Sequence, residues 1–64
     1  MKEVTKEQIY KGAIFGDSEG NEMTIKRISP TVYADGTEFD AETKNEEAMA
    51  TKLTKWGFKH IGCE

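Results

Sequence analysis

The segment 31–39, which reads Thr-Val-Tyr-Ala-Asp-Gly-Thr-Glu-Phe, constrains the fold of this chain more than any other. Asp35-Gly36 is a preferred pair for a two-residue type I′ turn, in which both central residues need a positive φ. A hairpin closed there pairs Tyr33 with Glu38, and because side chains alternate along strands both lie on one face. The opposite, core-facing side would hold Val32, Ala34, Thr37 and Phe39. The segment predicts antiparallel sheet but carries no chemistry.

The chain has 64 residues, enough for a single small domain, 1–64, near the lower size limit of chains that fold alone. Its large apolar side chains can fill one thin core and leave little volume for a deep pocket. We therefore expect a protein that is not an enzyme and needs no cofactor. The predicted core comprises Val4, Ile9, Tyr10, Ile14, Phe15, Met23, Ile25, Ile28, Val32, Phe39, Met49, Leu53, Trp56, Phe58 and Ile61.

Cys63 is the only cysteine. Small secreted domains are normally held together by several disulfides, so a chain with one thiol is expected in a reducing compartment. The sequence shows no apolar run long enough to span a bilayer and no basic leader followed by an apolar stretch. We expect a cytoplasmic protein that does not bind membranes.

The N-terminal region carries the signals of a short helix at residues 6–11. Thr5 and Gln8 fit a capping box, in which each side chain accepts a hydrogen bond from the other residue's backbone N–H. Gly12 suits the left-handed conformation that ends a helix. The alternative is a strand over residues 9–15.

Two further strands are expected at residues 12–16 and 22–28, because the segment between them is rich in turn-forming residues. Ile28 falls out of the alternating phase of the second strand, and a bulge near Lys26-Arg27 would restore it. The Ser-Pro pair that follows predicts a turn, since proline cannot donate to a central strand ladder.

The periodicity changes in the second half of the chain, where apolar residues recur at helical spacing. This pattern predicts a helix over about residues 41–56. Asp40 is one candidate N-cap, and a capping box from Thr43 to Glu46 offers a slightly later start. Gly57 is expected to end the helix in a Schellman motif.

Together these elements predict an α+β fold: a small antiparallel β-meander, a short N-terminal helix, a longer helix packed on the sheet, and a final strand at Phe58–Ile61. The meander cannot bury its apolar face alone, so the longer helix must cover it. The glycine-flanked first strand, bent second strand and tight hairpin over residues 12–40 resemble an SH3-like barrel, which is the alternative architecture. In general character the chain is similar to short proteins encoded by phages and mobile elements, although no motif carries this likeness.

The residues most often used in catalysis or metal binding form no recognised motif. His60, the single histidine, needs an orienting partner and a pocket to act as a base, and Cys63 lies beside the C-terminal residue. The oxygen-bearing side chains of residues 17–22 lack the glycine and bidentate glutamate of an EF-hand loop. We expect no catalytic residues and no metal site.

Acidic side chains crowd into the middle of a chain whose net charge is −3. Such a surface can steer a basic protein partner or mimic a nucleic-acid backbone in a basic groove, or it can simply keep a small domain soluble. We predict a small protein-binding module that binds another protein. Its predicted partner surface comprises Tyr33, Asp35, Glu38, Asp40, Glu42, Glu46 and Glu47.

A nucleic-acid-binding module is the alternative function. Sheet-based modules bind single strands through aromatic stacking and a cationic rim. The candidate patch comprises Lys11, Lys26, Arg27 and Tyr33. The opposing expectation is that these cations pair with nearby acids, and the negative net charge argues against broad non-specific binding. An exposed edge strand would also support a homodimer.

Overall fold

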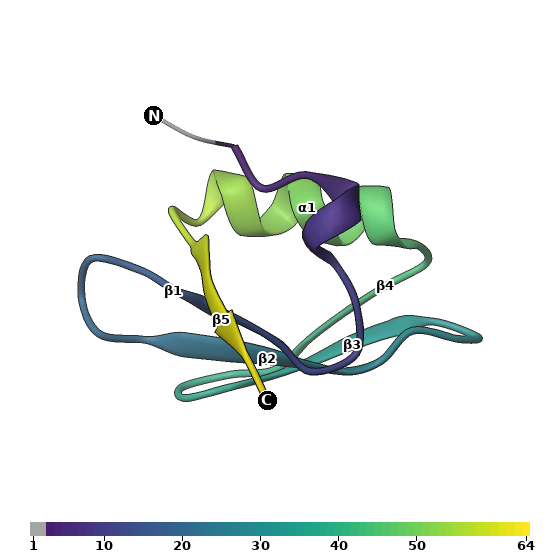
Figure 1. Cartoon of the computed structure of the whole chain (residues 1–64), viewed down its shortest axis with the longest axis horizontal. Coiled ribbons are helices and arrows are strands. Elements are labelled where there is room, and N and C mark those ends of the chain that lie inside the picture. Colours follow the sequence, from purple (N-terminus) through teal and green to yellow (C-terminus); the bar gives the residue numbers. More distant parts are fainter. Residues whose placement is uncertain (1–2) are drawn as a thin grey trace.

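The computed structural model describes residues 3–64 (Figure 1). Five strands and two helical segments follow one another in the predicted order. The elements are the 3-10 helix η1 (Lys6–Gln8), β1 (Ala13–Gly16), β2 (Glu22–Arg27), β3 (Val32–Gly36), β4 (Ala41–Thr43), α1 (Glu46–Lys55) and β5 (Lys59–Cys63).

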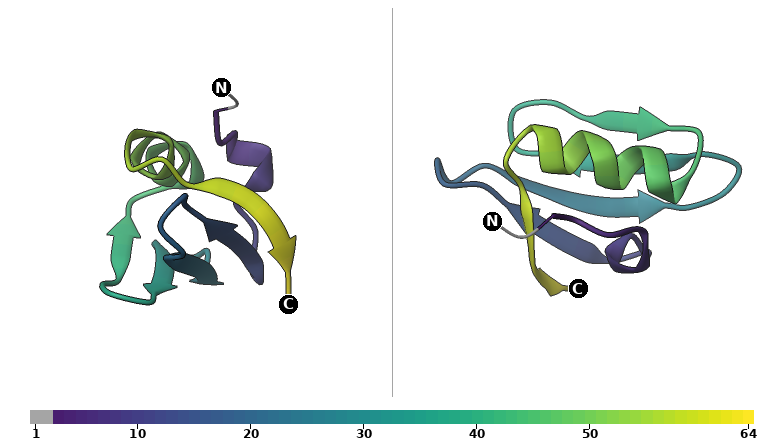
Figure 2. Two further views of the ribbon diagram at one scale, coloured as in Figure 1. Left: turned by 90° about the vertical axis from the view of Figure 1, so that its left-hand side faces the viewer. Right: turned by 90° about the horizontal axis from the view of Figure 1, so that it is seen from above.

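All five strands form one antiparallel sheet in the order β4-β3-β2-β1-β5. The first four strands form a meander, and β5 returns after α1 to pair with β1, extending past its predicted end at Ile61. α1 lies across one face of the sheet, and within residues 3–64 no second layer covers the opposite face (Figures 1 and 2). The predicted α+β fold is confirmed. The sheet is open, so the alternative SH3-like barrel does not form.

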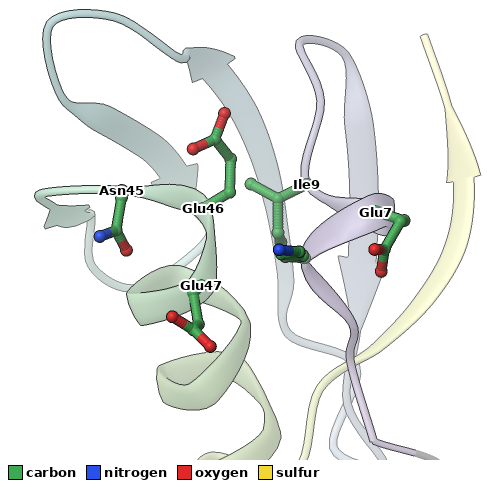
Figure 3. Close-up of a pocket in the computed structure, with 6 residues that line it drawn as sticks. Glu7, Ile9, Asn45, Glu46 and Glu47 are labelled. Atoms are coloured by element: carbon green, nitrogen blue, oxygen red, sulfur yellow. The ribbon is translucent and has the colours of Figure 1, made fainter.

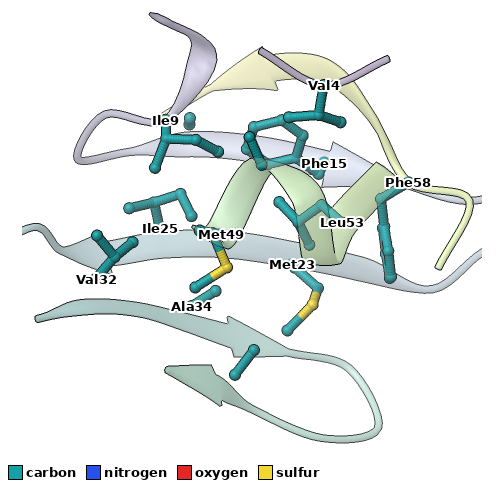
Figure 4. Packing of buried hydrophobic residues seen from close by; sticks show 13 residues of the cluster. Val4, Ile9, Phe15, Met23, Ile25, Val32, Ala34, Met49, Leu53 and Phe58 are labelled. Atoms are coloured by element: carbon teal, nitrogen blue, oxygen red, sulfur yellow. The ribbon is translucent and has the colours of Figure 1, made fainter. Parts of the chain in front are cut away.

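The core lies between α1 and the sheet (Figure 4). Alternation along the strands turns Phe15 of β1, Ile25 of β2 and Val32 of β3 toward the helix. Met49 and Leu53 lie one turn apart on the facing side of α1, and all five side chains are fully buried. Burying each contributes roughly 1.5–3 kcal/mol relative to leaving it exposed. This apolar contact holds α1 on the sheet.

Two local predictions are confirmed at the ends of elements. The register of β2 against β3 shifts between Ile25 and Arg27, where the sequence predicts a bulge. At the end of α1, Gly57 has a φ of 84°. The backbone N–H of Phe58 donates to the carbonyl oxygen of Leu53 (2.9 Å), which is the long hydrogen bond of a Schellman motif.

The predicted two-residue turn at Asp35-Gly36 is wrong. Both residues continue β3, and Gly36 pairs with Met23 of β2 without the positive φ that a type I′ turn requires. The next backbone N–H, that of Thr37, donates to the carbonyl oxygen of Glu22 (2.9 Å). Pairing with β2 therefore outweighs the local preference of Asp-Gly for a turn, and the chain reverses only afterwards.

This later reversal changes the register of the hairpin. Tyr33 pairs with Glu42 instead of Glu38. Thr43 lies opposite Val32, the position expected for Phe39, and Phe39 itself is 47% exposed. The predicted pairing across the hairpin is thus wrong, although the hairpin itself exists.

η1 is shorter than the helix predicted at residues 6–11. Oε1 of Gln8 accepts a hydrogen bond from the backbone N–H of Thr5 (3.3 Å), as expected for a capping box. The backbone becomes extended at Ile9, whose side chain is buried in the core. The chain leaves the helix early because this residue has to reach the sheet side of α1.

α1 begins later than predicted, because residues 41–43 form β4. Its N-cap is Asn45, whose side chain accepts a hydrogen bond from the backbone N–H of Ala48 (2.8 Å). Asp40 and Thr43, the caps proposed from the sequence, are wrong. Pairing of β4 with β3 keeps this stretch extended and delays the helix.

Part of the predicted core is not buried. Four of its members are exposed (Tyr10, Phe39, Trp56 and Ile61), two are half-buried (Ile14 and Ile28), and alanines at positions 13, 34, 41 and 50 are buried instead. Tyr10, Phe39 and Trp56 lie between elements or at their ends, where neither α1 nor the sheet encloses them. Hydrophobicity alone does not distinguish such positions from the core.

Replacing Asn45 with Ala should lower the free energy of unfolding by about 1 kcal/mol, because the N-cap hydrogen bond to α1 is lost. Urea unfolding of Asn45→Ala and of the neighbouring surface variant Lys44→Ala provides the measurement and its control. Equal effects of the two substitutions would contradict the assignment of Asn45 as the cap.

Candidate functional site

The uncovered face of the sheet is built from the outward positions of the strands. Ile14, Thr24 and Asp35 follow one another across β1, β2 and β3. A second row crosses from Arg27 on β2 through Tyr33 on β3 to Glu42 on β4. All the members of the second row are polar or charged, so chemical recognition on this face is concentrated toward β4.

Arg27 binds the acidic end of its row. Its Nη2 donates to Oε2 of Glu42 (2.6 Å), and the hydroxyl of Thr31 donates to the same oxygen (2.5 Å). The guanidinium lies 5.6 Å from the centre of the Tyr33 ring. The negative charge of Glu42 is therefore neutralised within the sheet, and the Tyr33 ring is held against a cation.

Tyr33 and two carboxylates form a close group beside that row. The Tyr33 hydroxyl donates to Oδ2 of Asp40 (2.5 Å), and the backbone N–H of Gly36 donates to Oδ1 (3.2 Å). The hydrogen bond from Tyr33, then that from Gly36 and then the contact with Asp35 lower the pKa of Asp40 below its ordinary value of 3.8. The hydrogen bond to Asp40, desolvation and the charges of Asp40 and Asp35 raise the pKa of Tyr33 above 10.0.

Exposed aromatic side chains adjoin this group. Phe39, in the loop between β3 and β4, meets Trp56 at the end of α1 edge to face, with ring centres 5.0 Å apart. The two side chains are 47% and 38% exposed. Glu38 and Asp40 flank Phe39 in the chain, so acidic and aromatic groups share this loop.

The structure divides the acidic surface predicted from the sequence. Tyr33, Asp35, Asp40 and Glu42 lie together on the sheet side, and Glu38 lies in the adjoining loop. The remaining two residues of that surface, at the start of α1, line a different pocket, of about 540 Å³, next to η1 (Figure 3). These two residues are Glu46 and Glu47, and Glu7 of η1 accompanies them.

The basic patch proposed for nucleic acid is paired with acids. Lys26 Nζ lies 3.0 Å from Oε2 of Glu64, and Arg27 binds Glu42. The structure does bring Arg27 against Tyr33, as that hypothesis requires. Lys11 is exposed between η1 and β1, outside the second row. The two cations of the patch that lie on β2 thus already have carboxylate partners.

His60 packs in an aromatic group. Its Nε2 lies 3.0 Å from the Tyr10 hydroxyl, and its ring centre lies 5.3 Å from that of Phe15. Desolvation, followed by the proximity of Cys63, raises the pKa of Tyr10. The contacts of His60 are those of a side chain that covers the edge of the core.

The acidic loop between β1 and β2 is occupied by its own hydrogen bonds. Oδ1 of Asp17 accepts from the backbone N–H groups of Glu19 and Asn21 (2.9 Å each), and Oδ2 accepts from the Asn21 side chain (3.1 Å). Desolvation raises the pKa of Asp17, but these hydrogen bonds prevail and lower it. The carboxylate stabilises the turn.

No family model, curated protein or solved structure matches the chain. Among residues 3–64, His, Cys, Asp and Glu side chains nowhere gather in groups of three or more with the spacing of a metal site. In the same part of the chain, no helix has the length and apolar character needed to cross a membrane. The description of the site therefore depends on its own geometry.

Sequence reasoning missed the pair Phe39 and Trp56, because it placed both in the core. The signal that separates them from core residues is their position: Phe39 follows the point where β3 ends, and Trp56 is the C-cap of α1. Residues at element ends are less often enclosed on all sides. The importance of Thr31, which bridges Arg27 and Glu42, also becomes visible only once the hairpin register is known.

Neutralising Asp40 should lower the pKa of Tyr33 toward 10.0, because its hydrogen bond to Asp40 is the largest cause of the raised pKa. The chain has two tyrosines, so Tyr10→Phe leaves Tyr33 as the only phenol for an ultraviolet pH titration. We expect a lower midpoint in Tyr10→Phe/Asp40→Asn than in Tyr10→Phe, and no change in Tyr10→Phe/Glu46→Gln. Equal midpoints in the first two variants would contradict the contact.

The same pKa shifts have opposite consequences for stability at the two ends of the pH range. The folded state holds the Tyr33 proton more tightly than the unfolded chain does, so the raised pKa of Tyr33 stabilises the fold below pH 10.0. This stabilisation is lost as the pH rises through the raised pKa. The depressed pKa of Asp40 contributes stability above pH 3.8, and this is lost as the pH falls through the folded-state pKa.

Proposed function

We propose that this protein is a small non-enzymatic module that binds a basic protein partner. The contact surface is formed by Tyr33, Asp35, Glu38 and Asp40, which we call the Tyr33 surface. The observation that carries the proposal is the hydrogen bond from Tyr33 to Asp40, with Asp35 beside it, on a sheet face that no helix covers. This places an aromatic side chain among carboxylates where a partner can reach it.

The chemistry of this group suits recognition of a cationic protein. Tyrosine is enriched among the residues that dominate binding energy, because a rigid ring buries area at little entropic cost. The Arg27 guanidinium and the Asp40 carboxylate hold the ring from two directions, so little freedom is left to lose on binding. The surrounding carboxylates attract basic partners over a distance and speed association.

Glu42 is left out of the candidate partner surface because its charge is already neutralised. Arg27 and Thr31 already satisfy its carboxylate, so it contributes little charge to a partner. Glu46 and Glu47 belong to the helical layer and lie next to η1. The Tyr33 surface, with Phe39 at its border, is therefore the compact part of the acidic region and fits a basic groove or loop.

The single cysteine supports the proposed compartment. Cys63 is exposed and has no disulfide partner. A thiol of this kind is compatible with a reducing compartment, where disulfides do not stabilise small domains. We propose that the module acts in the cytoplasm, and that a bacterium, a phage or a mobile element encodes it.

Removing charge from the Tyr33 surface should weaken capture of the partner. A tagged protein is used to pull down partners from a bacterial lysate, half of which is treated with nuclease. We expect a stoichiometric protein that survives nuclease, and about tenfold weaker capture by Asp35→Asn/Glu38→Gln. Glu46→Gln/Glu47→Gln removes the same charge from the helical layer and should leave capture unchanged.

Two outcomes would contradict the proposal. Equal weakening by both double variants would show that net charge, and not the Tyr33 surface, governs capture. Capture that disappears after nuclease treatment would favour the nucleic-acid module. In that case, binding should depend steeply on salt and on the Tyr33 ring.

A further inference from the structure

β4 is an open edge of the sheet, and a groove runs beside it along α1. β4 ends the strand order on one side, so one row of its backbone N–H and C=O groups has no neighbouring strand. α1 lies between β4 and η1 when the molecule is seen from above (Figure 2). Thr54 faces the η1 side, because its hydroxyl accepts a hydrogen bond from the backbone N–H of Val4 (2.8 Å). Residues on the opposite flank of α1 therefore face the β4 side.

A groove of about 620 Å³ runs along the outer surface of α1, and we call it the α1 groove. Lys44, at the end of β4, lines one end of the groove and Trp56 lines the other. Ala48 lies between them, with Lys52 one turn further along the helix. The Lys52 ammonium lies 5.5 Å from the centre of the Trp56 ring, so charge and aromatic surface are adjacent in the groove.

The α1 groove is positively charged in a protein that is negatively charged overall. Lys44, Lys52 and Lys55 line it, against the single acid Glu47. Among residues 3–64, none of these lysines lies within ion-pair distance of a carboxylate. Lys26 and Arg27 on the sheet face, by contrast, are both paired. The groove thus keeps three available cations, and its two ends adjoin β4 in the chain: Lys44 follows β4 directly, and Trp56 contacts Phe39, which precedes it.

We propose that the α1 groove binds an extended acidic segment of another polypeptide, which adds a strand to β4. Backbone N–H and C=O groups at a strand edge pair with a second polypeptide backbone, which a nucleic acid does not possess. Carboxylates of the segment would contact the groove lysines, and an apolar side chain would pack on Trp56 and Phe39. Because β4 has only three residues, the side-chain contacts must supply much of the affinity.

A second copy of this chain fits the groove less well than an acidic segment, and the other sheet edge is less suited to strand addition than β4. In a two-fold homodimer the same patch meets itself, so Lys52 and Lys55 of one copy would face those of the other. The opposite sheet edge, β5, is a poorer template because its pairing with β1 is interrupted by a bulge. The α1 groove and the Tyr33 surface share no residue, so either site can fail without the other.

A capped peptide that alternates Glu or Asp with Val or Phe tests the groove by ¹⁵N amide chemical-shift titration. We expect shifts at Ala41–Thr43 and at the Trp56 indole, and at least about tenfold weaker binding to Lys52→Glu/Lys55→Glu. Lys11→Glu/Lys59→Glu makes the same change of charge outside the groove and should bind as wild type. A peptide methylated on alternate backbone nitrogens cannot add a strand and should bind more weakly than the unmethylated peptide.

Several results would overturn this inference. Equal affinity of the methylated peptide would exclude strand addition, and shifts confined to the Tyr33 surface would exclude the groove. Displacement of the peptide by a single-stranded oligonucleotide at the same residues would assign the groove to nucleic acid. Self-association that Lys52→Glu/Lys55→Glu abolishes would assign it to a second copy of the chain.

Discussion

The packing of α1 on one face of the sheet determines the rest of this structure. Met49 and Leu53 of α1 close the core over strands β1 to β3, and among residues 3–64 α1 is the only long helix. A single helix can cover only one face of a five-stranded sheet. The other face must therefore be formed by side chains that tolerate water. The edge strands likewise have to avoid unwanted pairing with other chains without a helix that covers them. The Tyr33 surface lies on the face that α1 leaves uncovered, and the α1 groove lies on the helix itself.

Electrostatic pairing on the uncovered face decides which charges remain available. The exposed pairs Lys26 with Glu64 and Arg27 with Glu42 each contribute little to stability, about 0–1 kcal/mol. Their main effect is to neutralise most cations of that face, so the carboxylates around Tyr33 set its character. Lysines remain unpaired in the α1 groove instead. One small domain thereby presents an acidic aromatic surface and a basic groove on different flanks.

The sequence predicts this fold well where one local signal coincides with the tertiary contacts. Gly57 is an example, because the left-handed residue that ends α1 also directs Phe58 into the core. Prediction fails at Asp35-Gly36, where a strong local turn preference competes with continued pairing to β2, which only the assembled sheet provides. The late start of α1 has the same origin, since β4 pairs with β3 before the helix can begin.

The candidate site is predictable only in part for the same reason. Proximity in sequence groups Glu46 and Glu47 with Asp40, although the chain changes layer between them. Tyr33 and Asp40 meet because the hairpin turns later than Asp-Gly indicates, so their hydrogen bond depends on the feature that sequence reasoning misplaces. The aromatic pair Phe39 and Trp56 is hidden for a related reason, because residues at the ends of elements look like core residues in a hydrophobic pattern.

Amide hydrogen exchange on the complex with the nuclease-resistant partner tests the central claim most directly, because it locates the contact without any substitution. The loop that carries Glu38 and Asp40 provides the most informative amides, because it lies outside the strand ladders and is therefore expected to exchange quickly in the isolated protein. Binding through the Tyr33 surface predicts slower exchange over residues 37–40, with little change at the start of α1. Protection confined to η1 and the start of α1, or to Lys26 and Arg27, would contradict it.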